Sequence, residues 1–345
     1  MSLQSKYKKF TETIALSTKS TEYKDAREKD DAIYEKIKIA FVDEGYEIVG
    51  TRVLGSMGVH TGIQPLDGDH DIDRGVIISQ ESSPCNPIDV KKVVKNVLFN
   101  HGFSEPSIKK PCVTADYKTK PIHIDYVIFR KDDLDNYELA VGKETSDENN
   151  RKWDPSDPIG LKDWLTWKDE DKTSEERNQY YRIVRTLKRW RDHRYSNSSD
   201  RKKVYSIGLA VMLREKMCFS IDESGKANDH QALIDTLDSI MSGSYFDLDV
   251  LSIFTDETKY DLSVNLPTQP YRDIFTNHGV SVGTKLRKRL KSLLDTLNEV
   301  SVEPELAKQC DVLRDVFGDD FPTHDETEAR TKAKSAGVMS VSSGA

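Results

Sequence analysis

Three aspartates are the residues of this chain whose spacing points most directly to chemistry. Asp71 and Asp73 stand two positions apart in a run that reads as a strand, so their side chains project from the same face. Carboxylate oxygens are hard ligands that suit Mg²⁺, and two held side by side form a ready site for a divalent ion. Asp125 lies in an otherwise apolar strand, where a carboxylate is costly unless it is paired or bound to a metal. These three side chains are the candidate metal ligands.

A glycine–serine pair precedes the first two aspartates. Gly55 and Ser56 end a strand predicted over residues 46–54 and open a turn or short helix, whose backbone N–H groups and serine hydroxyl could cradle a phosphate. Each signal is weak alone, because Gly-Ser is usually only a turn and Asp-x-Asp is usually a solvated loop. The chain has other such pairs at Asp133/Asp135, Asp169/Asp171 and Asp247/Asp249. The order in which the pieces occur is what indicates a site.

The elements that must position these residues follow from hydrophobic periodicity. Helical spacing is found over residues 1–45, 89–100, 174–194, 205–219, 230–242 and 285–300, and strand-like runs over 46–54, 71–79 and 122–129. We therefore expect residues 1–150, N-terminal helices included, to form a mixed helix-and-sheet domain, and residues 151–322 a helical domain. The polar segment 143–160, with Pro155 and Pro158, marks the boundary. Residues 323–345 are polar and without period, which predicts a disordered tail.

Composition excludes some classes of function. Lysine and arginine number 51 against 59 aspartates and glutamates, so the net charge of −8 disfavours binding of nucleic acid by global charge. The longest apolar run, residues 207–213, is far short of the ~20 residues that a membrane span needs, and residues 1–6 lack the core of a signal peptide. The four cysteines lie far apart, which favours free thiols in a reducing compartment. A cytoplasmic location is the expectation.

The combined pattern resembles the polymerase-beta-like nucleotidyltransferases, and more specifically the bacterial cGAS/DncV-like nucleotidyltransferases (CD-NTases) of CBASS anti-phage defence. The matching features are Gly55-Ser56, the loop Thr61…Pro65-Leu66, the strand start Asp71-Ile72-Asp73 before Gly75, and the strand His123-Ile124-Asp125. One departure is His60-Thr61-Gly62, where we would expect Gly-Thr without the histidine. His60, His70 and His123 are left without a role, because hard-metal sites rarely use imidazole.

The resemblance implies an α+β fold and a set of roles. A polymerase-beta-like core, with a mixed sheet and flanking helices, would carry Asp71, Asp73 and Asp125 as catalytic ligands of Mg²⁺ (or Mn²⁺), with Gly55 and Ser56 binding the nucleotide. A C-terminal helical domain like that of oligoadenylate synthases would follow. There, residues 182–190 look like the helix bearing the donor-phosphate lysine, Lys188, and residues 205–209 look like the next helix, with a phosphate-contacting serine, Ser206. The competing interpretations are a solvated face for Lys188 and an N-cap for Ser206.

The implied activity is synthesis of a cyclic di- or trinucleotide second messenger from NTPs, ATP and/or GTP, with release of pyrophosphate. Two metal ions would bridge the carboxylates and the triphosphate, and Asp125 would serve as ligand and base. The alternatives are a template-independent nucleotidyltransferase making linear oligonucleotides or modifying RNA ends or protein, and an inactive nucleotide-binding regulator. The implied partner is an E1/E2-like ligase acting on the tail that ends at Ala345, or other CBASS operon proteins. Neither a membrane nor strong nucleic-acid binding is expected.

Overall fold

The structure is a computed structural model that describes residues 2–16, 18, 21–66, 70–116, 122–195, 197–254, 257–276 and 278–324. The predicted tail lies outside these residues from position 325 onward, and so do the side chains of several residues beside the gaps, among them Asp71. The chain forms two compact units. The sheet unit comprises Leu16–Glu170 and Asn265–Arg272, and the helical unit comprises Met1–Ala15, Asp171–Val264 and the chain from Asp273.

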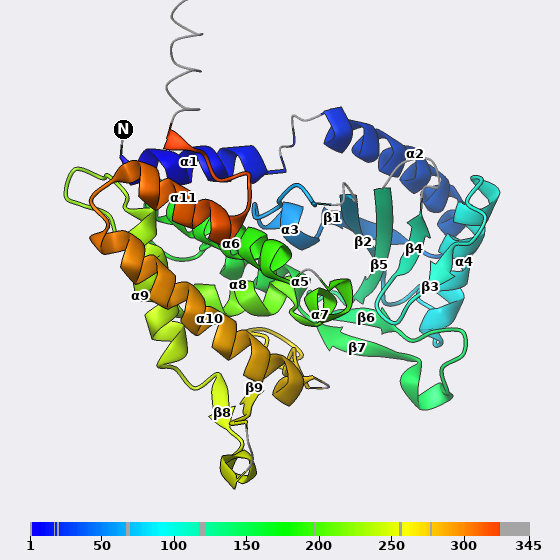
Figure 1. Ribbon diagram of the computed structural model, residues 1–345. Helices are drawn as coiled ribbons and strands as arrows, with labels where there is room; N and C mark the ends of the chain where they lie inside the picture. The colour runs from blue at the N-terminus through cyan, green and yellow to red at the C-terminus, as the bar shows by residue number, and fades with distance from the viewer. Residues whose placement is uncertain are drawn as a thin grey trace, which may run out of the picture. The chain divides into compact units, whose positions relative to one another are not determined.

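The sheet unit is built on a mixed seven-stranded sheet (Figure 1). Its main path runs in the order β1 (Ile48–Val53), β2 (His70–Ser79), β5 (Ile122–Lys131), β4 (Val113–Asp116) and β3 (Ser107–Ile108). β6 (Tyr137–Val141) pairs with the far end of β5, and β7 (Lys152–Ser156) pairs with β6. Among the strands described, β2 and β5 pair in parallel and the other pairings are antiparallel.

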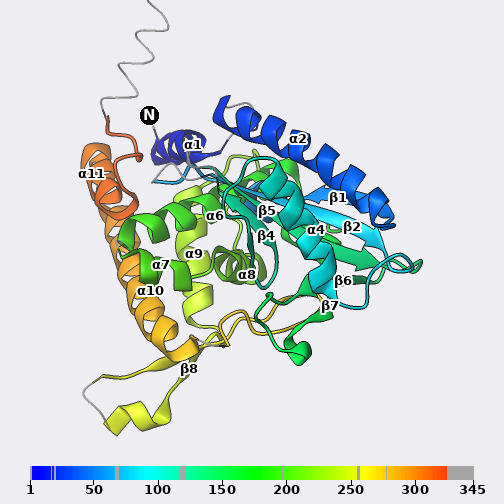
Figure 2. The same cartoon turned by 90° about the vertical axis from the view of Figure 1, so that its right-hand side faces the viewer.

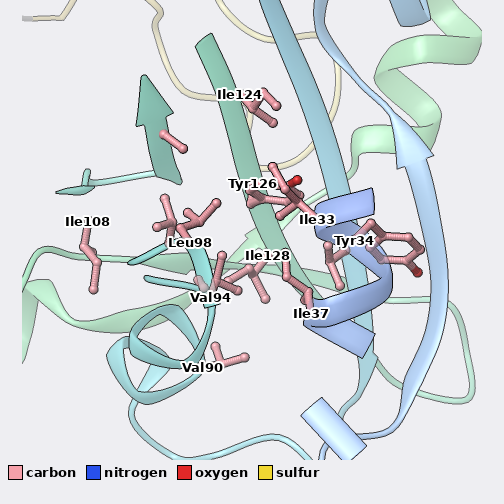
Figure 3. Close-up of a cluster of buried hydrophobic side chains, with 14 of the residues drawn as sticks. Ile33, Tyr34, Ile37, Val90, Val94, Leu98, Ile108, Ile124, Tyr126 and Ile128 are labelled. Atoms are coloured by element: carbon pink, nitrogen blue, oxygen red, sulfur yellow. The ribbon is translucent and has the colours of Figure 1, made fainter. Parts of the chain in front are cut away.

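Two helices cover one face of this sheet, α2 (Thr21–Asp43) and α4 (Pro87–Asn100) (Figure 2). The start of α4 is fixed by Asn86, whose side chain accepts from the N–H of Ile88, and by Pro87 in its first turn. The core lies between these helices and every second residue of β5, as Figure 3 shows. Its labelled side chains are Ile33, Tyr34 and Ile37 of α2, Val90, Val94 and Leu98 of α4, Ile124, Tyr126 and Ile128 of β5, and Ile108.

The sheet unit also holds three short helices. α3 (Gly55–Gly58) follows β1, a 3₁₀ turn covers Glu148–Asn150, and α5 (Pro158–Leu165) follows β7. β7 lies within the polar segment that the sequence marked as a boundary. It contains Pro155, and it pairs with β6 on one side only, as is usual for strands that contain proline. The sheet unit therefore continues to Glu170, whereas the sequence suggested a domain end at residue 150.

The helical unit contains most of the second half of the chain and also its first helix. Its helices are α1 (Leu3–Ile14), α6 (Ser174–Arg194), α7 (Ser198–Lys203), α8 (Ser206–Lys216), α9 (Asp229–Met241), α10 (Gly279–Val302) and α11 (Leu306–Phe317), with a small hairpin of β8 (Phe246–Leu248) and β9 (Tyr260–Leu262) around the 3₁₀ turn Val250–Phe254. α1 joins this unit through aromatic contacts. Phe10 lies 5.6 and 5.2 Å from the ring centroids of Phe317 and Phe321.

The expected α+β architecture, a mixed sheet with flanking helices and a helical C-terminal region, is confirmed. The strands predicted over 46–54, 71–79 and 122–129 correspond to β1, β2 and β5, and each helical run of the second half corresponds to a helix. The sequence placed the N-terminal helices together in the first domain, but the structure assigns α1 to the helical unit. Among the described residues, no helix is long and apolar enough to cross a membrane.

The helical unit contains a histidine whose surroundings make stability depend on pH. His230 is 6% exposed, accepts from the Tyr7 hydroxyl at Nδ1 (2.9 Å) and donates from Nε2 to the Leu297 carbonyl (3.0 Å) in the neutral tautomer that fits both bonds. Burial lowers its pKa to about 4. The unfolded chain, with an ordinary histidine pKa of about 6.5, therefore binds more protons than the folded chain between these two values.

We expect the free energy of unfolding to fall as pH drops from 6.5 to 4, with about 2–3 kcal/mol of that loss due to His230. Urea unfolding at pH 7 and pH 4.5 measures it. Carboxylates contribute to the same window, so the comparison is with His230→Asn, which keeps a polar side chain but cannot titrate. At pH 7 the variant should have a lower free energy of unfolding than wild type. Between pH 7 and pH 4.5 that free energy should fall less in the variant than in wild type. Equal losses in both proteins would contradict the assignment.

Candidate active site

The parallel pairing of β2 and β5 brings two of the three predicted carboxylates together. Asp73 is the direct register partner of Asp125, and Asp71 is the partner of His123. Register partners on neighbouring strands point to the same face, with the strands about 4.8 Å apart. Asp73 and Asp125 therefore lie side by side, both half-buried, on the face opposite the α2–α4 core. Asp71 occupies the same face two positions earlier, but its side chain lies outside the described residues.

The carboxylate of Asp125 is oriented by the neighbouring strand. Thr114 of β4 is its antiparallel partner, and the Thr114 hydroxyl donates to Oδ1 of Asp125. Cys112 lies just beyond, 3% exposed, with its sulfur 3.7 Å from the Thr114 hydroxyl oxygen. Burial, and then the negative charge of Asp125, raise the pKa of the Cys112 thiol to about 12. The thiol is thus protonated at neutral pH beside a carboxylate that has one oxygen held in place.

Gly55 lies in contact with the other carboxylate, and a larger residue there would displace that carboxylate. Its φ is +59°, and a Cβ built on it would come within 1.9 Å of Oδ2 of Asp73. The chain is held in this position by the N–H of Leu54, which donates to the Asp73 carbonyl at 2.9 Å. The end of β1, the start of α3 and Asp73 therefore form one closely packed group. Ser56, half-buried, is the next residue of this group.

The loop after α3 shows how the chain accommodates the unexpected histidine. His60 takes a left-handed conformation with φ of 60°, which few residues other than glycine adopt readily. Thr61 is 3% exposed, and its N–H donates to the Ser56 carbonyl at 2.9 Å, so that the loop folds back on the start of α3. Among the other histidines near the motif, His123 contacts the Asp116 carboxylate through Nδ1, and the side chain of His70 is not described.

The donor set on this face fits a hard divalent cation. Two carboxylates in direct register offer oxygen ligands of the kind that Mg²⁺ and Mn²⁺ prefer, and the missing side chain of Gly55 makes room for the Asp73 carboxylate. Among the described side chains, no group of three or more histidine, cysteine, aspartate or glutamate residues could hold a metal. The third carboxylate that the sequence predicts, Asp71, is outside that search.

The predicted phosphate-binding lysine lies on α6, in the helical unit. The helix begins with a capping box formed by Thr173 and Glu176, and its apolar stripe of Ile183, Val184, Leu187 and Trp190 is buried as expected. The competing interpretation of a solvated cationic face is wrong for Lys188, which is only 6% exposed. Lysine side chains are mostly exposed to solvent, so burial is not expected from the sequence. Here tertiary packing buries Lys188.

Ser206 is not an N-cap, contrary to the other competing interpretation. The N-cap of α8 is Tyr205, which makes no side-chain cap bond, and Ser206 is the first helical residue. Its hydroxyl accepts from Nη1 of Arg191, which also donates to the Val204 carbonyl at 3.1 Å. Arg191 thus fixes the turn that presents Ser206. Arg191 was not predicted from the sequence, although it lies about one turn after Lys188 on the same helix, and neither was Thr114.

Comparison with known proteins agrees with the resemblance drawn from the sequence. Residues 51–129, which span β1 to β5 and include Gly55, Asp73 and Asp125, match the family described as "Cyclic GMP-AMP synthase DncV-like, nucleotidyltransferase domain". A cyclic GMP-AMP synthase of Escherichia albertii is 28% identical over 172 residues. That match covers 47% of this chain and 36% of the relative, so the chain spans little more than a third of its length.

Solved structures share the fold at low sequence identity. The E. coli MS115-1 CdnC with ATP has a TM-score of 0.63 at 14% identity, covering 92% of this chain and 98% of that chain. The CD-NTase CdnG of Bradyrhizobium diazoefficiens with GTP has 0.62 at 14%, covering 91% and 95%. DncV of Vibrio cholerae, with the linear intermediate 5′ pppA(3′,5′)pG, has 0.55 at 16%, covering 79% and 69%. The resemblance to bacterial cGAS/DncV-like nucleotidyltransferases is confirmed.

The contact between Gly55 and Asp73 generates a sharp test. Gly55→Ala would force the Asp73 carboxylate aside. We expect the rate of nucleotidyl transfer to fall by roughly tenfold to a hundredfold. Transfer from a labelled nucleoside triphosphate measures it. The matched control is Gly45→Ala, because Gly45 also has a positive φ (+78°) but nothing within 4 Å of its built Cβ. Both variants should lose about 1 kcal/mol of stability, and only the first should lose activity. If Gly55→Ala and Gly45→Ala have equal activities, the contact between Gly55 and Asp73 does not matter for activity.

Proposed function

We propose that this chain, whose residues 51–129 form a DncV-like nucleotidyltransferase domain, is a cyclic oligonucleotide synthase. It would join NTPs, ATP and/or GTP, into a cyclic di- or trinucleotide and release pyrophosphate. The observation that carries the proposal is the direct register of Asp73 with Asp125 beside Gly55, inside the matched domain. The structures of similar fold solved with ATP, with GTP and with a linear dinucleotide intermediate support it.

Each residue of the site has a proposed task. Asp73 and Asp125, with Asp71, would hold Mg²⁺ (or Mn²⁺), which when bound supplies positive charge to the triphosphate and to the acceptor hydroxyl. Asp125 would take the proton of that hydroxyl at Oδ2, because Oδ1 already accepts from Thr114. Gly55 and Ser56 would lie against the donor triphosphate, since Gly55 presents backbone without a side chain. Lys188 and Ser206 would contact donor phosphates, with Arg191 orienting Ser206.

Two other functions remain distinguishable by experiment. A nucleotidyltransferase that makes linear oligonucleotides, or that modifies RNA ends or protein, would use the same carboxylates but leave a phosphatase-sensitive product. An inactive nucleotide-binding regulator would make no product. Incubating the full chain with all four NTPs and Mg²⁺ or Mn²⁺, followed by mass and nuclease analysis, separates the three functions. A phosphatase-resistant ring supports the proposal, and a linear product or none overturns it.

The setting and partners are also proposals. Four free cysteines support work in the cytoplasm. A role in CBASS is proposed from the resemblance drawn from the sequence. CdnC, which is similar in fold, has also been solved in a CdnC:HORMA-deltaN complex, and this supports a protein partner. An E1/E2-like ligase acting on residues 323–345, or another CBASS protein, is proposed as that partner.

Neutralising one carboxylate tests the metal site. Asp73→Asn keeps the shape of the side chain and removes its charge, so we expect at least roughly a thousandfold loss of turnover, about 4 kcal/mol at the transition state, with the fold intact. Asp71→Asn and Asp125→Asn should behave alike. Because the three act as a unit, combining them should add little further loss. Initial rates of pyrophosphate release give the measurement.

The control for these variants is an Asp-x-Asp pair that lacks the preceding Gly-Ser. Asp133 and Asp135 lie in the hairpin between β5 and β6, where Asp135 has φ of 59° and pairs with Lys131. Asparagine tolerates this conformation, so the double variant Asp133→Asn with Asp135→Asn should be neutral in turnover. Near-normal activity in any one of the three site variants would contradict the metal-ligand assignment.

The role of Lys188 can be separated from its packing. Lys188→Ala should raise the KM for the donor nucleotide more than it lowers kcat, because an ammonium that holds ground-state phosphates contributes mainly to binding. Arg189→Ala is the matched control, since Arg189 is 3% exposed on the same helix and pairs with Asp320 at 3.3 Å. It should lower stability and leave KM unchanged. If Lys188→Ala shows the same behaviour, Lys188 is a structural residue.

A further inference from the structure

A buried polar cluster lies directly behind the proposed metal ligands, on the other face of the sheet. Arg74 follows Asp73 in β2, Tyr126 follows Asp125 in β5, and Arg74 and Tyr126 are themselves register partners. Because side chains alternate along a strand, both point away from the carboxylates and toward α2. They are 4% and 0% exposed, respectively. The paired carboxylates on one face are thus backed by a paired arginine and tyrosine on the other.

One carboxylate, that of Asp30 in α2, holds both of these side chains. Asp30 is fully buried. Nε of Arg74 donates to its Oδ1 and Oδ2 at 2.8 and 2.9 Å, and the Tyr126 hydroxyl donates to the same Oδ1 at 3.1 Å. A single oxygen therefore receives one bond from β2 and one from β5. If β2 shifted or rotated relative to β5, one of these two hydrogen bonds to Asp30 would break.

Further contacts fix the arginine in this position. Its guanidinium lies over the Tyr34 ring, 4.5 Å from the centroid, and its Nη1 donates to the Thr51 hydroxyl of β1 at 3.4 Å. Ion pairs with Asp30 and Asp31 balance its charge. The cluster connects α2, β1, β2 and β5 through directional bonds.

A purely stabilising role is a poor account of this arrangement. Replacing a buried ion pair by well-packed apolar residues is often neutral or stabilising, so such a pair contributes little to stability that an apolar core could not. Its directional bonds give fixed geometry instead. Metal ligands have to be held within about 0.5 Å of their working positions, and hydrogen-bonded residues behind them supply that constraint.

We propose that Asp30 is a positioning residue for the metal site: through Arg74 and Tyr126 it fixes the spacing of Asp73 and Asp125. The inference rests on the proposed function, because it takes these two carboxylates to be metal ligands. Asp30 is not itself proposed to bind the metal or the nucleotide. It acts from the far face of the sheet, in a helix outside the matched residues 51–129.

The test is the affinity of the full chain for Mn²⁺, measured without turnover by the electron paramagnetic resonance signal of free Mn²⁺. Asp30→Asn keeps the side-chain shape but loses the charge and one acceptor oxygen. We expect its Mn²⁺ affinity to fall about tenfold, with a loss of kcat of similar size, while the nucleotide KM at saturating Mn²⁺ stays within about twofold. Adding Mn²⁺ should restore part of the activity.

A milder variant covers the case in which Asp30→Asn does not fold. Tyr126→Phe removes only the hydroxyl that ties β5 to Asp30, and we expect its Mn²⁺ affinity to fall about threefold. The matched control is Asp229→Asn in the helical unit. Asp229 is also fully buried and binds Arg182 through Nε (2.6 Å) and Nη2 (2.9 Å). It should lower stability as Asp30→Asn does and leave Mn²⁺ affinity unchanged.

The outcomes separate this inference from the proposed function. If the wild-type chain binds Mn²⁺ and transfers nucleotides, but Asp30→Asn and Tyr126→Phe bind Mn²⁺ as tightly as wild type, the positioning role is overturned and the function stands. If Asp229→Asn weakens Mn²⁺ binding equally, the effect is general destabilisation and the role is again overturned. If the wild-type chain neither binds Mn²⁺ nor makes product, the proposed function itself fails.

Discussion

The parallel pairing of β2 with β5 is the constraint on which the rest of the sheet unit depends. It places Asp73 directly beside Asp125. Like charges at register partners, on strands about 4.8 Å apart, repel one another. Backbone pairing over ten residue pairs, from His70↔Ile122 to Ser79↔Lys131, imposes this proximity. A divalent cation would relieve the repulsion, so the fold holds the two charges in an arrangement that favours metal binding.

Parallel pairing has a structural requirement of its own, because the chain must cross over between the two strands. Here the crossover contains α4, β3 and β4. Two of these parts, α4 and β4, serve the pair that they connect. α4 covers the apolar face with Val90, Val94 and Leu98, and β4 extends the sheet and places Thr114 beside Asp125. The connection that makes the carboxylate pair possible thus also orients one of its members.

The sequence predicts this arrangement in part. Alternation and helical period locate β1, β2, β5, α2 and α4, and the resemblance selects the three aspartates. The pairing of residue 73 with residue 125 is set by packing between segments far apart in the chain, which no local pattern records. β3 and β4 are two and four residues long, too short for a periodic signal. Asp30 and Arg74 look like surface charges in the sequence, because their burial depends on each other.

The division into units follows the packing of side chains more closely than the order of the chain. α1 joins the helical unit because Tyr7 and Phe10 find aromatic partners in Phe317 and Phe321, which come near the other end of the described chain. In the sheet unit, the N–H of Asp157 donates to the carbonyl of Gln269 at 3.2 Å, which ties residues 265–272 to the segment after β7. Each unit is therefore completed by a segment distant in sequence.

A cut at residue 150 would remove β7 and leave an open edge on β6, because a strand's N–H and C=O groups need the partner that β7 supplies. The carboxylate pair thus depends on a longer stretch of chain than the 51–129 match that identifies it.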